Sequence, residues 1–106
     1  DELLRERWPA ARLVAFGHVG DGNLHYNVVP PGDLSAEDWT DEGERITRAL
    51  YDLVDSLNGS FSAEHGVGQS KKAYLASYRA GPELDLMRSL KKILDPADIL
   101  NPGKVI

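Results

Sequence analysis

The sequence predicts an α+β fold, in which a small antiparallel sheet carries helices on one face. Two short stretches rich in apolar residues flank a Gly-Asp-Gly-Asn turn, which is typical of a β-hairpin. Two later stretches carry apolar residues at helical spacing, each as a single stripe that needs another element to cover it. The chain has 106 residues, a net charge of −5 and no cysteine. This length predicts a single domain over residues 1–106.

Proline, glycine and capping residues set the limits of the predicted elements. These are, in chain order, a helix end at 1–8, strands at 13–16 and 24–29, a helix from 35 or 40 to 57, a third strand or extended segment at 60–63, and helices at 70–78 and 82–94. Pro9 stops the first helix, and Pro30 ends the second strand because proline lacks a ladder donor. Ser35 and Thr40 offer two starts for the long helix. Asn58-Gly59 ends it, with the glycine suited to the left-handed position.

The two longer helices should each bury their apolar stripe. The stripes are Ile46, Leu50, Leu53, Val54 and Leu57 in the first helix, and Leu84, Met87, Leu90, Ile93 and Leu94 in the second. Pro82 suits the first position of the second helix. The extended segment before Glu64 should deliver Glu64 and His65, and adjacent residues of an extended chain point to opposite sides. We therefore expect these two residues to have different roles.

All three histidines lie in two glycine-rich motifs. The motifs are Gly17-His-Val-Gly-Asp-Gly-Asn-Leu-His25 and Glu64-His-Gly-Val-Gly68. The hairpin should bring His18 near His25, and alternation places His25 and Asn27 on one face of the second strand. With Glu64 as a third ligand, these residue types allow a site for zinc, manganese or iron that leaves positions for water or substrate. The His-x6-His spacing matches no zinc signature, so a structural role for the histidines stays open.

Together with Asn101-Pro-Gly-Lys104, these motifs resemble the C-terminal part of FAD-linked 2-hydroxy-acid dehydrogenases. This group, among the vanillyl-alcohol-oxidase-like flavoproteins, includes D-lactate dehydrogenase, the flavin subunit of glycolate oxidase and D-2-hydroxyglutarate dehydrogenase. The resemblance runs in matching order from Leu13 to Val105. It implies part of a ferredoxin-like cap domain, whose partner is an N-terminal FAD-binding domain that 106 residues do not include. Since the chain begins within a predicted helix and without methionine, we expect an excised or processed fragment.

The resemblance also implies a reaction, in which flavin oxidises a D-2-hydroxy acid to a 2-oxo acid. The implied roles are metal ligands for His18, His25 and Glu64, general base for His65, substrate contact for Asn27, and FAD contact for Asn101 and Lys104. The FAD itself would be held mainly by the missing domain. The divalent metal is expected to be zinc, with manganese or iron as alternatives. We expect the isolated chain to be inactive.

Other classes of function are excluded or stay open as hypotheses. The acidic balance argues against a nucleic-acid surface, which needs basic residues. No apolar run approaches the roughly 20 residues of a membrane span, so we expect a cytoplasmic protein, with peripheral membrane attachment of the parent enzyme left open. An uncovered sheet edge makes a homodimer a hypothesis. The alternatives to a dehydrogenase are a non-catalytic dimerisation or partner-binding module with structural histidines, and a zinc hydrolase with Glu64 or His65 as base.

Overall fold

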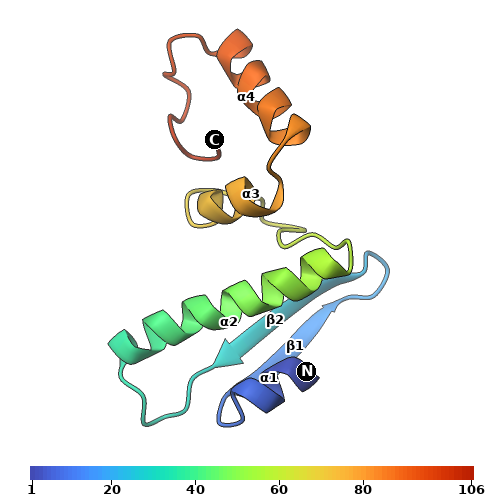
Figure 1. The fold of residues 1–106 in the computed structure, drawn as a ribbon, viewed down its shortest axis with the longest axis vertical. Helices are drawn as coiled ribbons and strands as arrows, with labels where there is room; N and C mark the ends of the chain where they lie inside the picture. Colours follow the sequence, from blue (N-terminus) through green and yellow to red (C-terminus); the bar gives the residue numbers. More distant parts are fainter. The chain divides into compact units, whose positions relative to one another are not determined.

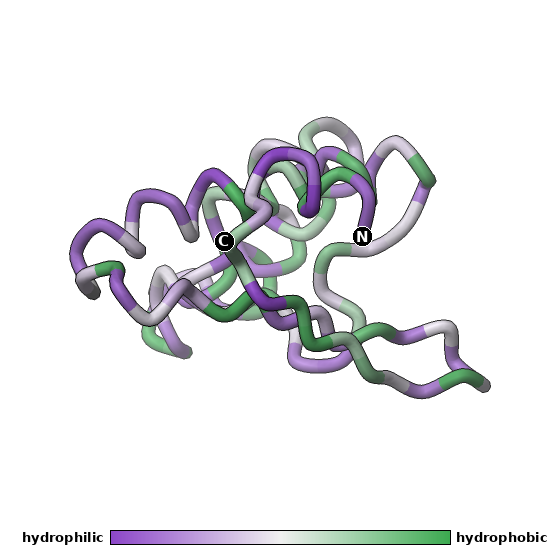
Figure 2. Tube along the Cα trace, turned by 90° about the horizontal axis from the view of Figure 1, so that it is seen from below, coloured by the Kyte–Doolittle hydropathy of each residue, from purple (hydrophilic) through white to green (hydrophobic). Residues whose placement is uncertain are grey.

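A computed structural model describes the backbone of residues 1–106 and every side chain except that of residue 36. Its elements are α1 (Glu2–Arg7), β1 (Arg12–His18), β2 (Asn23–Val29), α2 (Ala36–Ser56), α3 (Lys72–Tyr78) and α4 (Pro82–Leu94) (Figure 1). The two strands form one antiparallel sheet, so the predicted α+β class is confirmed. The first turns of α2 are largely hydrophilic, and its apolar residues gather in the second half (Figure 2).

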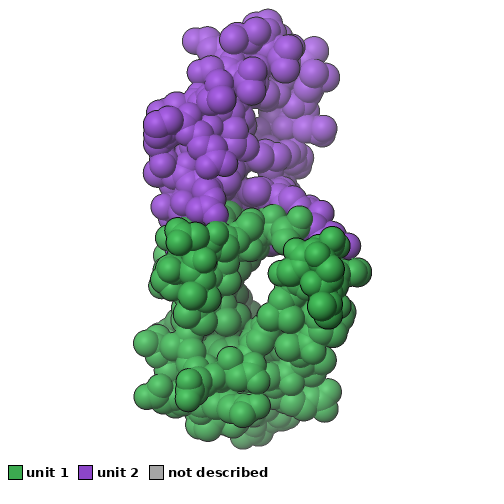
Figure 3. Space-filling model, turned by 90° about the vertical axis from the view of Figure 1, so that its right-hand side faces the viewer, with its two compact units in different colours: residues 1–63 green, residues 64–106 purple. Residues whose placement is uncertain are grey.

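The chain divides into two compact units, coloured separately in Figure 3. Unit 1 is Asp1–Ala63 and unit 2 is Glu64–Ile106. The prediction of a single domain stays a prediction. Across the described residues, every helix is too short or too polar to cross a lipid bilayer.

The hairpin of β1 and β2 is held in one register, from Arg12 opposite Val29 to His18 opposite Asn23. Gly17 marks a close approach of its two backbones. A Cβ atom on Gly17 would lie 2.1 Å from the carbonyl oxygen of Asn23, so only glycine fits there without a shift of the backbone. The hairpin can therefore close tightly beside His18, where the turn begins.

The core of unit 1 is small. Leu4 of α1 and Ile46 of α2 are its buried apolar residues. The indole of Trp8 donates a hydrogen bond to the carboxylate of Glu42, which links the end of α1 to α2. The apolar stripe predicted to be buried along α2 is covered only in part, since Leu57 at its end is exposed. A two-stranded sheet of seven-residue strands offers less surface than a helix of 21 residues needs.

The start of α2 follows the first of its two predicted positions. The Ser35 hydroxyl oxygen accepts a hydrogen bond of 3.1 Å from the backbone N–H of Asp38, and Ser35 occupies the N-cap. This bond satisfies one of the amide groups that a helix leaves unpaired at its N-terminus.

The end of α2 lies where it was predicted. The left-handed conformation was predicted for Gly59, and this was wrong, because Asn58 adopts it with φ 56°. The backbone N–H of Gly59 donates to the carbonyl of Val54 at 2.8 Å, and that of Asn58 donates to Asp55 at 2.9 Å. This pattern is a Schellman motif. Glycine is still favoured at 59, because a Cβ there would lie 3.0 Å from Cγ1 of Val54.

Residues 60–63 were predicted to form a third strand or an extended segment, and the strand is wrong. These residues form bends and irregular chain and do not join the sheet, whose order is β1–β2. The ring of Phe61 packs instead against Tyr51 of α2, with centroids 5.0 Å apart. The one large apolar side chain of this segment therefore contacts a helix.

In unit 2, α4 begins at Pro82 as predicted, whereas α3 begins two residues later than expected, at Lys72. Leu75 of α3 and Leu84 of α4 are buried. The second half of the stripe on α4 was predicted to be core and is not: Ile93 and Leu94 are 74% and 76% exposed. Unit 2 holds no strand in the part of the chain described, and its other helix has only seven residues, so nothing of sufficient size covers this face.

A buried carboxylate organises the chain after α4. Asp95 is 6% exposed and accepts hydrogen bonds from the backbone N–H groups of Ile99 at 3.0 Å and Leu100 at 2.9 Å. The ammonium group of Lys91 pairs with the same carboxylate. The hydrogen bond from Lys91 lowers the pKa of Asp95, helped by the two backbone donors, and it raises the pKa of Lys91. Lys91 also pairs with Asp98 at 3.3 Å, so the loop 95–100 is built around this lysine and the buried carboxylate of Asp95.

Candidate metal centre

The hairpin places two imidazole rings on one face of the sheet. His18 pairs with Asn23, and His25 pairs with Phe16. Residues directly opposite each other in an antiparallel sheet share a face, and so do alternate residues of one strand. The ring centroids of His18 and His25 lie 5.7 Å apart, with ring planes inclined by 58°. The predicted proximity of these two histidines is confirmed.

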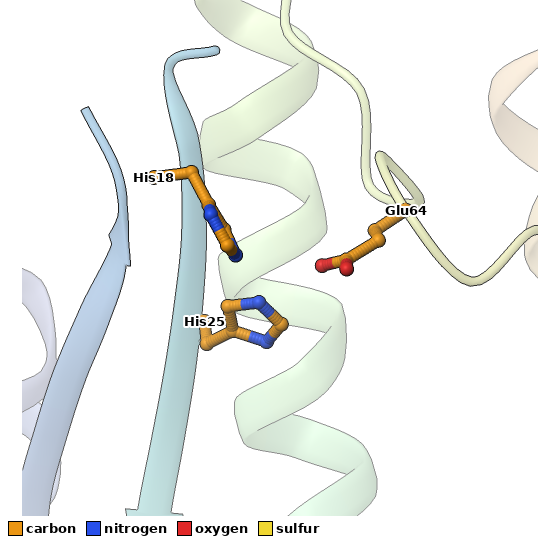
Figure 4. Close-up of side chains that lie close together, drawn as sticks. All are labelled: His18, His25 and Glu64. Carbon is orange, nitrogen blue, oxygen red and sulfur yellow. The ribbon is translucent and has the colours of Figure 1, made fainter. Parts of the chain in front are cut away.

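Glu64 completes a group of three. One ligand atom from each of His18, His25 and Glu64 lies within 4.8 Å of the others, and the carboxylate points toward the two rings (Figure 4). Glu64 directly follows Ala63, the last residue of unit 1.

The three side chains fit a divalent cation. Two imidazole nitrogens and a carboxylate oxygen suit zinc, manganese and iron, and three protein ligands leave positions for water or substrate. In a tetrahedral zinc site with bonds of about 2.0–2.1 Å, the ligand atoms lie about 3.3 Å apart. The observed limit of 4.8 Å means that small side-chain rotations must close the group. His18 and Glu64 are both exposed to solvent.

Phe16 is a neighbour of this group that the sequence reasoning missed. Its ring stacks on His25 with centroids 5.0 Å apart and ring planes 8° from parallel. The signal was present in the sequence, because a hairpin that sets His18 opposite Asn23 also sets Phe16 opposite His25. The ring contacts a proposed ligand without itself offering a ligand atom.

The remaining predicted residues lie outside the three-residue group. Asn27 is exposed and pairs with Val14, two residues beyond His25 on the same face of the hairpin. His65 is exposed and follows Glu64 in the chain. Since both side chains are accessible, the roles proposed for them in substrate binding and proton transfer stay predictions.

Asn101 and Lys104 bracket the predicted turn in unit 2. The backbone N–H of Lys104 donates to the carbonyl of Asn101 at 3.3 Å, and Gly103 has φ 66°, as a type II turn requires. The ammonium group of Lys72 donates to the carbonyl of Gly103 at 3.5 Å. The turn is confirmed, and contact of Asn101 and Lys104 with FAD stays a prediction.

Comparison with known proteins places this geometry in a family. Residues 1–105 match the model of the C-terminal domain of FAD linked oxidases. The chain is 46% identical over 103 residues to D-2-hydroxyglutarate dehydrogenase of Xanthomonas citri, covering 97% of this chain and 22% of the relative. It is 40% identical over 91 residues to the mitochondrial D-lactate dehydrogenase [cytochrome] of Arabidopsis thaliana, covering 86% and 16%.

A third relative is the glycolate oxidase subunit GlcD of Bacillus subtilis, which is 37% identical over 93 residues, or 88% of this chain and 19% of the relative. The chain thus spans about a fifth of the length of these curated relatives. The match runs through the hairpin, Glu64 and the final turn, and it includes every residue of the proposed metal centre. The chain belongs to the FAD-linked oxidase family and corresponds to its C-terminal domain.

Proposed function

We propose that this chain is the substrate- and metal-binding C-terminal part of an FAD-dependent dehydrogenase that oxidises a D-2-hydroxy acid to a 2-oxo acid. The observation that carries the proposal is the convergence of ligand atoms from His18, His25 and Glu64 within 4.8 Å. The family membership supports it. The compounds named for the relatives, which are D-2-hydroxyglutarate, D-lactate and glycolate, share a hydroxyl group on the carbon next to a carboxylate.

In the parent enzyme, FAD and the metal would be bound mainly by different domains. We propose that FAD is held mainly by an N-terminal domain, because residues 1–106 contain no glycine fingerprint of a dinucleotide site before a helix. Asn101 and Lys104 are exposed, and their amide and ammonium groups are hydrogen-bond donors suited to the polar edge of a flavin. Without the other domain, the chain should bind metal but oxidise nothing.

The three-residue group and its neighbours would divide the chemistry of oxidation. His18, His25 and Glu64 would hold a divalent cation beside the substrate. When bound, the cation supplies a Lewis acid that polarises the hydroxyl, and the flavin supplies the acceptor for the hydride. His65 would take the hydroxyl proton on an imidazole nitrogen as the Cα hydride leaves. Asn27 would hold the substrate by a hydrogen bond from its amide.

Metal content is the first test. We expect one equivalent of zinc, manganese or iron in the purified chain, and none in the double variant His18→Ala, His25→Ala. Added zinc should raise the melting temperature of the unmutated chain alone, because a ligand that binds only the folded state stabilises it. The matched control is His65→Ala, which changes a histidine of the same motif region but should keep its metal. Absence of both metal and a zinc-dependent shift would favour a non-catalytic module with structural histidines.

The reaction is tested on the parent chain that includes the flavin domain. Bleaching of the flavin absorbance under anaerobic conditions should follow addition of D-2-hydroxyglutarate, D-lactate or glycolate. His65→Asn should slow this bleaching by about 10²–10⁴-fold, the usual contribution of a general base, while leaving metal content intact. Equal rates in the variant would remove His65 from the mechanism.

A further inference from the structure

We propose that Phe16 is a positioning residue for His25, fixing the plane of its imidazole and so the direction of its ligand nitrogen. This inference rests on the proposed metal site and adds a residue that offers no ligand atom to it. The stack between the two rings carries it: centroids 5.0 Å apart and planes 8° from parallel.

Burial in a core does not explain the position of Phe16. Its side chain is 57% exposed, whereas the core residues of unit 1, Leu4 and Ile46, are almost fully buried. A large exposed aromatic ring contributes little through the hydrophobic effect. The contact that the structure shows for this ring is its stack on His25.

The stacking contact restricts χ2 of His25, the torsion that sets the direction of its ligand nitrogen. Rotation of an imidazole about χ2 is soft, with broad wells rather than three sharp ones. The lone pair of an imidazole nitrogen lies in the plane of the ring, so the torsion aims the ligand. A parallel aromatic neighbour holds that plane and leaves only two orientations, related by a flip. Phe16 thus fixes the orientation of the His25 ring already in the metal-free chain.

The orientation that results is suited to a shared ion. A cation bound to both histidines has to lie close to both ring planes. The planes of His18 and His25 cross at 58°, so they meet along a line, whereas two parallel rings facing each other share no such line. Because Phe16 holds the plane of His25, it helps to set where this line lies.

The test compares three variants of the full 106-residue chain. Phe16→Leu keeps an apolar side chain of similar size but removes the ring, and Phe16→Tyr restores the ring. The matched control is Leu24→Ala, since Leu24 is similarly exposed at 61% on the opposite face of the hairpin. The measurements are the zinc dissociation constant, by competition with a chelator, and the proton shifts of the His25 ring in the metal-free chain.

We expect Phe16→Leu to weaken zinc binding about three- to tenfold, because the binding step must then immobilise a freer side chain. The His25 ring protons should move downfield as the ring current of Phe16 is lost. Phe16→Tyr should restore both values, and Leu24→Ala should change neither. Zinc binding by Phe16→Leu as tight as by the unmutated chain would overturn the role of Phe16 alone. No zinc binding by the unmutated chain would overturn the proposed metal site and this inference together.

Discussion

Replacing Gly17 by alanine tests whether the close approach of the two strands sets the hairpin. The new Cβ would lie 2.1 Å from the carbonyl oxygen of Asn23 and 3.0 Å from Cα of Leu24. Real Cβ contacts do not fall below about 3.0 Å, so the backbones must separate by roughly 0.9 Å. The obstructing atoms belong to the main chain and cannot rotate away, as a flexible side chain would.

The expected loss follows from the cost of overpacking, which is about 1–3 kcal/mol. A clash with backbone atoms inside a strand pair belongs at the upper end, about 2–3 kcal/mol. In a chain of this size such a loss lowers the melting temperature by about 10–20 °C. Thermal unfolding followed by circular dichroism would measure it, together with the two-state test of coincident transitions from a second probe.

The turn offers a matched control in Gly20→Ala. A Cβ on Gly20 meets no atom within 4 Å and its φ is not in the left-handed region, so alanine there should be neutral or slightly stabilising. A melting temperature for Gly17→Ala within about 2 °C of that for Gly20→Ala would refute the argument from strand approach. Zinc binding gives a second readout, since displacement of Asn23 should also shift His18, its partner in the ladder.

Three further predictions concern the stability of each unit. The pKa of Asp95 is lowered in the folded chain, so its ionised carboxylate should stabilise the fold above about pH 4 and lose this effect as the pH falls toward the folded pKa. The free energy of unfolding, measured by urea titrations between pH 2 and pH 7, should therefore decrease as the pH is lowered. In the variant Asp95→Asn this dependence on pH should be weaker. Asn58, with φ 56°, should tolerate glycine with little change, whereas Asn58→Ala should lose about 1 kcal/mol in urea denaturation. Ser35→Ala should lose about 1 kcal/mol by the same measurement, because the N–H of Asp38 then lacks its capping acceptor; a variant as stable as the unmutated chain would show that water replaces the cap without loss.

Local patterns predicted the hairpin and its histidines well, because both depend on short-range rules. Alternation gave the faces of β2, and the glycine-rich turn gave the pairing that places His18 beside His25. The predictions that failed depended on what lies opposite an apolar residue. Residues 60–63 were predicted as a strand or extended segment, but Phe61 packs on Tyr51 of α2, and Ile93 was assigned to a buried stripe but is exposed. A periodic pattern shows that a face is apolar and leaves open which element covers it.

The third ligand, Glu64, is far in sequence from the two histidines, and the segment between α2 and Glu64 contains two local contacts. The Schellman motif at Asn58 and Gly59 turns the chain sharply after α2. Two residues later, the ring of Phe61 packs on Tyr51 and returns the chain to the helix. Glu64 follows after three residues, so two short-range anchors define the path that brings its carboxylate to the hairpin. The third ligand therefore follows α2 in the chain, and its distance in sequence from the histidines is what sequence patterns alone could not bridge.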